Sequence, residues 1–156
     1  EIARIIKANL ADCGIRVALD FRPSWELSLP GPDGPLFGRR FDLAEHTWRT
    51  GFIPPCEHYL STEIPDKGHR YGDNIAGYSN PDYDAFCQAA LRAWPGTSKY
   101  DEYHREAQVL FSTELPAIPL FMRPRIAVIR PDVQGLTLDA TAPSELWSIE
   151  TLDRGP

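Results

Sequence analysis

The sequence lacks long apolar runs, basic clusters and an excess of positive charge. No apolar stretch reaches the roughly 20 residues that a helix needs to cross a bilayer, and the longest run of basic residues is Arg39-Arg40. The formal net charge is -6. A surface that follows nucleic-acid phosphates needs clustered Lys and Arg, so nucleic acid is not an expected partner.

The sequence also lacks the spacings that place several ligands on one metal or cofactor. Four histidines lie far apart, and none belongs to an HxH or HxxxH pair. The phosphate-binding patterns GxxxxGK[ST] and GxGxxG are absent. We therefore expect no bound metal and no cofactor. The histidines are His46, His58, His69 and His104.

Cysteine is scarce as well, because the chain has only Cys13, Cys56 and Cys87. Their spacing matches neither a zinc ribbon nor a CxxC redox site. Buried or half-buried thiols are the plainer interpretation, since free cysteine is often buried. A disulfide between Cys56 and Cys87 is an open alternative.

A nucleophile for an enzyme is also hard to find. Ser79 lies in GYSNP, which lacks the second glycine of the GxSxG turn that exposes a catalytic serine. The sequence shows neither a nucleophile paired with a base nor a metal-binding cluster. A hydrolase is therefore the weaker alternative, and we expect a protein that is not an enzyme.

What is present is a chain of 156 residues with 42% hydrophobic content, enough for one ordinary domain with a core. Helical spacing runs from Ile2 to Leu10, and no N-cap precedes it. The missing cap and the missing signal peptide suggest a piece of a longer protein. Asn80-Pro81 predicts the start of a second helix that ends near Trp94, and a third helix follows from Ser98.

Strands are expected between these helices. Alternation of apolar and polar residues predicts strands over 15–21 and 40–47, and apolar stretches interrupted by proline predict strands over 118–129 and 145–152. Residues 23–38 are rich in proline and glycine and predict a short helical turn followed by a surface loop. This order of helices and strands favours an α/β or α+β architecture.

Trp48 ends the second expected strand and precedes the polar turn Arg49-Thr50-Gly51. Ligands of α/β proteins often bind where strands end in loops. Trp48 is therefore a candidate for ligand contact, and an ordinary core tryptophan is the alternative.

One segment narrows these possibilities. GYSNPDYDAFCQAA, residues 77–90, resembles a stretch of family 5 extracellular solute-binding proteins, which include oligopeptide- and dipeptide-binding proteins of ABC importers. Four further segments resemble the same family in the same order, and together the five are distributed over residues 8–136, most of the chain. They are ANLADCGIRVAL, RFDLAEHTW, AQVLFSTELPAIPLF and RPDVQGL.

The resemblance implies an α/β fold, the C-terminal lobe portion of a two-lobed, type II periplasmic-binding-protein-like fold. Residues 1–126 would belong to the C-terminal ligand-binding lobe, and residues 127–156 would return across the hinge to the other lobe. A fragment of this kind should expose apolar surface to the missing N-terminal part of the same protein.

The resemblance also implies function and partners. The protein would be a transport protein that captures a peptide or related small solute and delivers it to the ABC permease subunits in the membrane. It would be periplasmic or extracellular, and a lipoprotein if the organism lacks an outer membrane. A ligand-sensing module of a receptor or regulator with the same fold is the alternative.

The family pattern suggests the ligand contacts. Trp48 matches a tryptophan that lines the cleft of peptide-binding relatives, and Gly51 stands where they place an aspartate that holds the peptide amine. Thr50 and Gly51 would add polar or backbone contacts, and Asn74 and Tyr78 would face the same cleft. A substitute counter-charge could come from Glu45 or Glu57.

Overall fold

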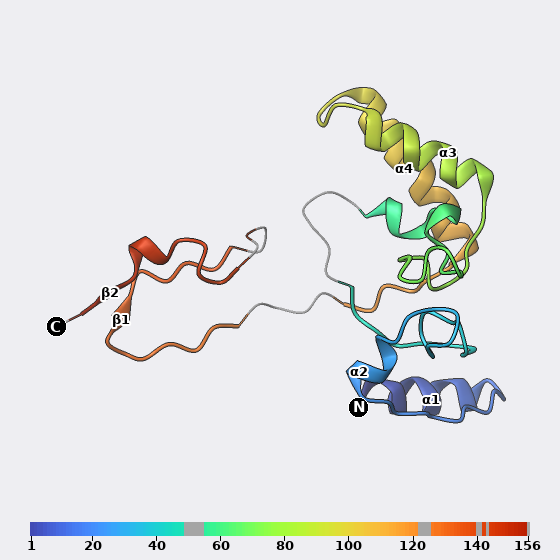
Figure 1. The fold of residues 1–156 in the computed structure, drawn as a ribbon, viewed down its shortest axis with the longest axis horizontal. Coiled ribbons are helices and arrows are strands. Elements are labelled where there is room, and N and C mark those ends of the chain that lie inside the picture. Colours follow the sequence, from blue (N-terminus) through green and yellow to red (C-terminus); the bar gives the residue numbers. More distant parts are fainter. Residues whose placement is uncertain (49–54, 122–125, 140–141, 143, 156) are drawn as a thin grey trace. The chain divides into compact units, whose positions relative to one another are not determined.

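The computed structural model describes residues 1–48, 55–121, 126–139, 142 and 144–155 (Figure 1). The described residues form two compact units that meet in sequence between Ala117 and Ile118. This division precedes the boundary predicted between residues 126 and 127. Within the described ranges, no helix is both long and apolar enough for a membrane span.

The first unit contains four α-helices and two 3-10 helices. Helix α1 covers Ile2–Asp12 and is followed by Cys13 and Gly14, whose positive φ of 80° is accessible to glycine. Helix α2, Ser24–Leu27, is the short turn expected before the surface loop. The 3-10 helices η1 and η2 cover Cys56–Tyr59 and Ser61–Glu63.

Helices α3, Pro81–Arg92, and α4, Ser98–Glu114, form the helical hairpin of this unit (Figure 1). The expected N-cap is confirmed, because the Asn80 side chain accepts hydrogen bonds from the backbone N–H groups of Asp82 and Tyr83 at 2.9 and 3.1 Å. Pro81 occupies the first turn, where its missing N–H costs no helical hydrogen bond. Both predicted helices are thus present.

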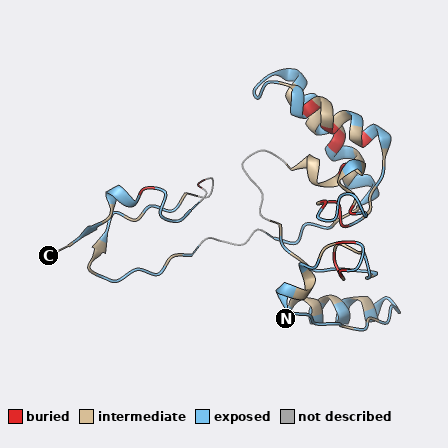
Figure 2. Ribbon diagram, viewed as in Figure 1, coloured by how far each residue is buried: buried red, intermediate tan, exposed pale blue. Residues whose placement is uncertain are grey.

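The core of this unit lies between the hairpin and η1. Its buried members are Leu60, Tyr83, Cys87 and Ala107. The buried positions cluster on the facing sides of the two helices and in the loops beside them (Figure 2). Aromatic rings pack against this core, where Tyr59 meets Phe111 edge-on with ring centroids 4.7 Å apart.

The first two expected strands are not formed. Residues 15–21 and 40–47 follow extended or bent paths without a ladder partner, and the single strand pair of the described chain lies in the second unit. A strand needs a partner to accept its hydrogen bonds, and alternation in sequence does not supply one. Residues 15–21 run beside α1 instead, where the Arg4 guanidinium lies 6.0 Å from the Phe21 ring centroid.

The second unit contains a short antiparallel pair, β1, Val133–Gln134, and β2, Asp153–Arg154, with Val133 opposite Arg154. The strand predicted over 145–152 is wrong, because Ile149–Thr151 forms the 3-10 helix η3. Leu146, Ile149 and Leu152 are three residues apart, which is the period of a 3-10 turn. Backbone bonds from Ile149 to Leu146 and from Leu152 to Ile149 close those turns.

The predicted strand over 118–129 is also not formed in the residues described there, which make no ladder. Several of its apolar side chains are exposed, from 46% at Ile129 to 94% at Val128. Exposed apolar surface, expected for a lobe portion, is present at these positions. The assignment to a two-lobed fold stays a prediction.

The buried tyrosine of the core predicts loss of stability at alkaline pH. Burial, reinforced by Tyr78 and Tyr59 nearby, raises the pKa of Tyr83. The contribution of the Tyr83 hydroxyl to the free energy of unfolding is fully present below the pKa of tyrosine in the unfolded chain, about 10. It is lost as the pH rises toward the pKa in the folded protein, by up to about 1.4 kcal/mol per pH unit. Urea unfolding between about pH 8 and 11.5 should show this decline, and Tyr83→Phe should make it shallower. Equal slopes for both proteins would contradict the burial effect.

Candidate functional site

The candidate site is built on η1, whose four residues follow Pro55. A covalent bond and a hydrogen bond hold its first residue against α3. Cys56 and Cys87 form a disulfide with their Cα atoms 5.7 Å apart, which decides the alternative that the sequence left open. The Tyr83 hydroxyl donates a 2.8 Å hydrogen bond to the carbonyl oxygen of Cys56. The two cysteines are 31 residues apart in the sequence. In the chain-entropy model, closing a loop of this length stabilises the folded state by about 3–4 kcal/mol.

Asn74 holds the other end of η1. Its side-chain amide donates hydrogen bonds to the carbonyl oxygens of Tyr59, Leu60 and Tyr78 at 3.1, 2.9 and 2.7 Å. Its side-chain oxygen accepts from the backbone N–H of Tyr78 at 3.0 Å. Asn74 is 0% exposed, so this buried amide is engaged entirely with the backbone around it.

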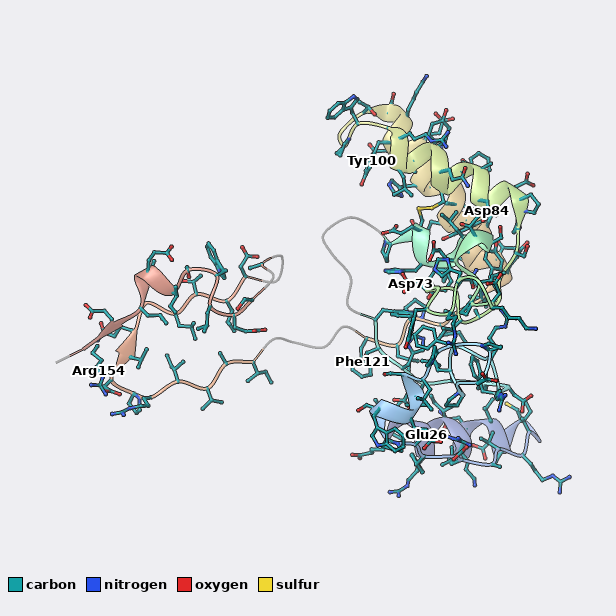
Figure 3. The ribbon with its side chains drawn as sticks, viewed as in Figure 1. Glu26, Asp73, Asp84, Tyr100, Phe121 and Arg154 are labelled. Atoms are coloured by element: carbon teal, nitrogen blue, oxygen red, sulfur yellow. A yellow bond between two sulfur atoms is a disulfide. The ribbon has the colours of Figure 1, made fainter. Side chains whose placement is uncertain are left out.

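The contacts that Cys56, Tyr83 and Asn74 make to hold η1, which we call the frame, continue at η2. Asp84, labelled on α3 in Figure 3, accepts hydrogen bonds from the backbone N–H of Ser61, at 3.0 Å, and from the Ser61 hydroxyl. An acidic side chain near the start of α3 also lies favourably in the field of the helix dipole. Asp84 therefore joins the helical hairpin to the segment that carries η1 and η2.

The frame presents a group of side chains that we call the Trp48 cluster: His46, Trp48, His58 and Asp73. The rings of Trp48 and His58 are stacked, with an interplanar angle of 4° and centroids 5.6 Å apart. His46 meets Trp48 edge-on at 4.8 Å. The His58 Nδ1 and a carboxylate oxygen of Asp73 lie 2.8 Å apart in a hydrogen bond.

The rings of the cluster are partly buried, and His58 is joined to a carboxylate. Trp48 and His58 are half-buried, so neither ring is withdrawn wholly into the core. Burial lowers the pKa of His46, which favours its neutral form. Where Nδ1 of His58 donates to Asp73, Nε2 of the neutral ring is an acceptor. The cluster thus combines stacked aromatic rings with a histidine–carboxylate hydrogen bond.

The residues predicted from the sequence divide into three groups. Trp48 lies in the cluster and is half-buried, and its contact with a ligand stays a prediction. Thr50 and Gly51 lie outside the described residues. Asn74 and Tyr78 are joined to each other and to the frame, and their contact with a ligand stays a prediction.

Tyr78 packs into the frame with its ring edge-on to that of Tyr83, at a centroid separation of 5.2 Å. Its hydroxyl is enclosed without a well-formed hydrogen-bond partner in the described chain. Burial, together with the Glu114 carboxylate nearby, raises its pKa. Tyr78 is thus a neutral hydroxyl at physiological pH, placed on the core side of the loop that carries Asn74.

The sequence did not single out His58 or Asp73. They are 15 residues apart, and no short motif joins them. The two carboxylates considered as counter-charges differ in surroundings, because Glu45 is exposed whereas Glu57 lies in η1 with one buried oxygen that has no hydrogen-bond partner in the described chain. No group of three or more metal-binding side chains occurs among the residues that the structure describes.

Two curated proteins are similar to this chain over 140 residues, or 88% of its length. One is the peptide transport periplasmic protein SapA of Salmonella typhimurium strain LT2, with 26% identity. The other is the probable ABC transporter periplasmic-binding protein SapA of Escherichia coli K12, with 25% identity. The chain spans 24% of the length of each relative.

No family model and no solved structure matches the chain. The similarity to the two SapA proteins supports, at a coarse level, the relationship to solute-binding proteins that the five motifs indicated. Both relatives are named as binding proteins of transport systems, and neither is named as an enzyme.

The buried amide of Asn74 gives a direct test of the frame. Asn74→Ala leaves three carbonyl oxygens and one N–H without their partner, and each buried unsatisfied group costs about 1–3 kcal/mol. We expect a loss of at least about 3 kcal/mol in the free energy of unfolding, because several groups are affected at once. Chemical denaturation measures it.

Asn80→Ala is the matched control, since it also removes an asparagine that bonds to backbone, at the half-buried start of α3. It should cost about 1 kcal/mol. An Asn74→Ala loss no larger than that of the control would contradict the frame described here.

Proposed function

We propose that this chain is part of an extracytoplasmic solute-binding protein that captures a peptide or related small solute and delivers it to an ABC permease. The observation that carries the proposal is the similarity to two periplasmic transport proteins over 88% of the chain. The order of the five motifs supports the same assignment, and we place the chain with family 5 of these proteins, in the C-terminal portion.

The chemistry of the frame is consistent with this location. The Cys56–Cys87 disulfide persists in oxidising compartments such as the periplasm and the cell surface. Cytosolic proteins rarely keep such bonds. Periplasmic or extracellular placement, with a lipid anchor where no outer membrane exists, therefore belongs to the proposal.

The mechanism that follows is binding without bond formation. Trp48 would offer its face to the ligand, and the two-lobed protein would close by rotation at a hinge that includes residues 127–130. A few residues at the ends of elements usually absorb such a rotation. Permease subunits would then receive the ligand from the closed form.

Native mass spectrometry of the full-length protein tests the function directly. We expect a fraction of the purified protein to carry a bound small molecule, released on denaturation and identified as a peptide or related solute. A protein that carries none and binds no member of a peptide library by calorimetry would contradict the proposal, as would catalytic turnover abolished by Ser79→Ala.

Trp48→Ala tests the contact residue in the same protein. Loss of an aromatic stacking contact costs about 0.5–1.5 kcal/mol beyond the lost area, so the Kd for the identified ligand should rise about tenfold. Calorimetric titration measures the change. Trp94→Ala is the control, because Trp94 is 82% exposed at the end of α3 and lies outside the Trp48 cluster; an unchanged Kd for Trp48→Ala would remove Trp48 from the site.

A further inference from the structure

The position of His58 depends on contacts that η1 receives from other elements. A 3-10 helix of four residues has too few internal hydrogen bonds to be stable alone, and η1 has no side-chain cap. Its fixed points are therefore external. They are the disulfide to Cys87, the Tyr83 hydroxyl on the Cys56 carbonyl, and the Asn74 amide on the Tyr59 and Leu60 carbonyls.

The two cysteines are not equivalent. Cys87 is 0% exposed in the middle of α3, whereas Cys56 is only half-buried at the start of η1. Helix α3 has its own cap from Asn80 and packs along α4. If the bond opens, the buried thiol of Cys87 can stay in place as a small apolar group. Helix η1 then loses its covalent attachment and keeps only the hydrogen bonds from Tyr83 and Asn74, so it is the element expected to shift.

Movement of η1 would separate the stacked rings. His58 is two residues after Cys56 and is the member of the Trp48 cluster that η1 carries. Its Nδ1 bond to Asp73 and its stack on Trp48 both require that the η1 backbone stays where it is. The disulfide at Cys56 thus restrains the position of His58 through the backbone of η1.

We propose that the Cys56–Cys87 disulfide positions His58 on Trp48, so that the Trp48 cluster is assembled in the oxidised protein and disassembled on reduction, while the α3–α4 hairpin persists. Reduction by an external dithiol breaks the Sγ–Sγ bond and gives two thiols, and the dithiol becomes the disulfide. The consequence for ligand capture, that the site is complete only in an oxidising compartment, rests on the proposed function.

The test uses the full-length protein with labelled histidine Cε1 and a Cys13→Ser background, which removes the exposed free thiol. The His58 resonance is identified by its loss in His58→Gln. In the oxidised protein the ring current of Trp48 should displace that resonance, and Trp48→Leu should remove the displacement. Far-UV circular dichroism reports the helices in the same samples.

On reduction with dithiothreitol, or in Cys56→Ala/Cys87→Ala, we expect the displacement to vanish with the helical signal retained, and reoxidation of the reduced wild-type pair to restore it. Tyr83→Phe, which removes only the neighbouring hydrogen bond, should retain most of the displacement. A displacement that survives reduction would overturn the inference. Loss of the helical signal together with the displacement would overturn it as well, because the disulfide would then stabilise the whole fold and not the position of His58 in particular. This readout needs no ligand, so its failure is distinct from a failure of the proposed function.

Discussion

The attachment of η1 to α3 is the constraint on which the first unit depends. A buried tyrosine hydroxyl, a disulfide and a buried asparagine amide fix both ends of a helix of only four residues. Because that helix has little stability of its own, the position of His58 follows from these contacts, and the stack on Trp48 follows from His58. The candidate site is therefore a product of the core beneath it.

The segment that most resembles the solute-binding family is, in physical terms, the joint between the hairpin and η1. Asn80 caps α3, Tyr83 reaches the Cys56 carbonyl, and Asp84 holds Ser61. Tyr78 packs its ring against Tyr83. The resemblance thus rests on residues that build the frame, which explains how it can indicate a scaffold without identifying a ligand.

The elements that the sequence predicted well are those fixed by local chemistry. The Asn80-Pro81 start and the glycine after α1 act within a few residues, so the helices could be placed from the sequence. The strands could not, because a ladder depends on a partner elsewhere in the chain. For the same reason, the sequence could not show that His58 and Asp73 belong to the candidate site. The hydrogen bond between them and the stack of His58 on Trp48 join residues that are distant in the sequence.

The charge of the cluster bears on the kind of solute that it can hold. The carboxylate that the described residues bring to Trp48 is Asp73, and its oxygen is already hydrogen-bonded to His58 at 2.8 Å. His58 engages one oxygen of that carboxylate, and the second oxygen can accept a further hydrogen bond. Position 51 is a glycine, so the aspartate that the family resemblance implies for a peptide amine is not present there, and Glu57, which has a buried oxygen without a hydrogen-bond partner in the described chain, is another carboxylate of η1. Under the proposed function, we therefore expect stacking on Trp48 and hydrogen bonding to His58 to contribute to the selection of the solute.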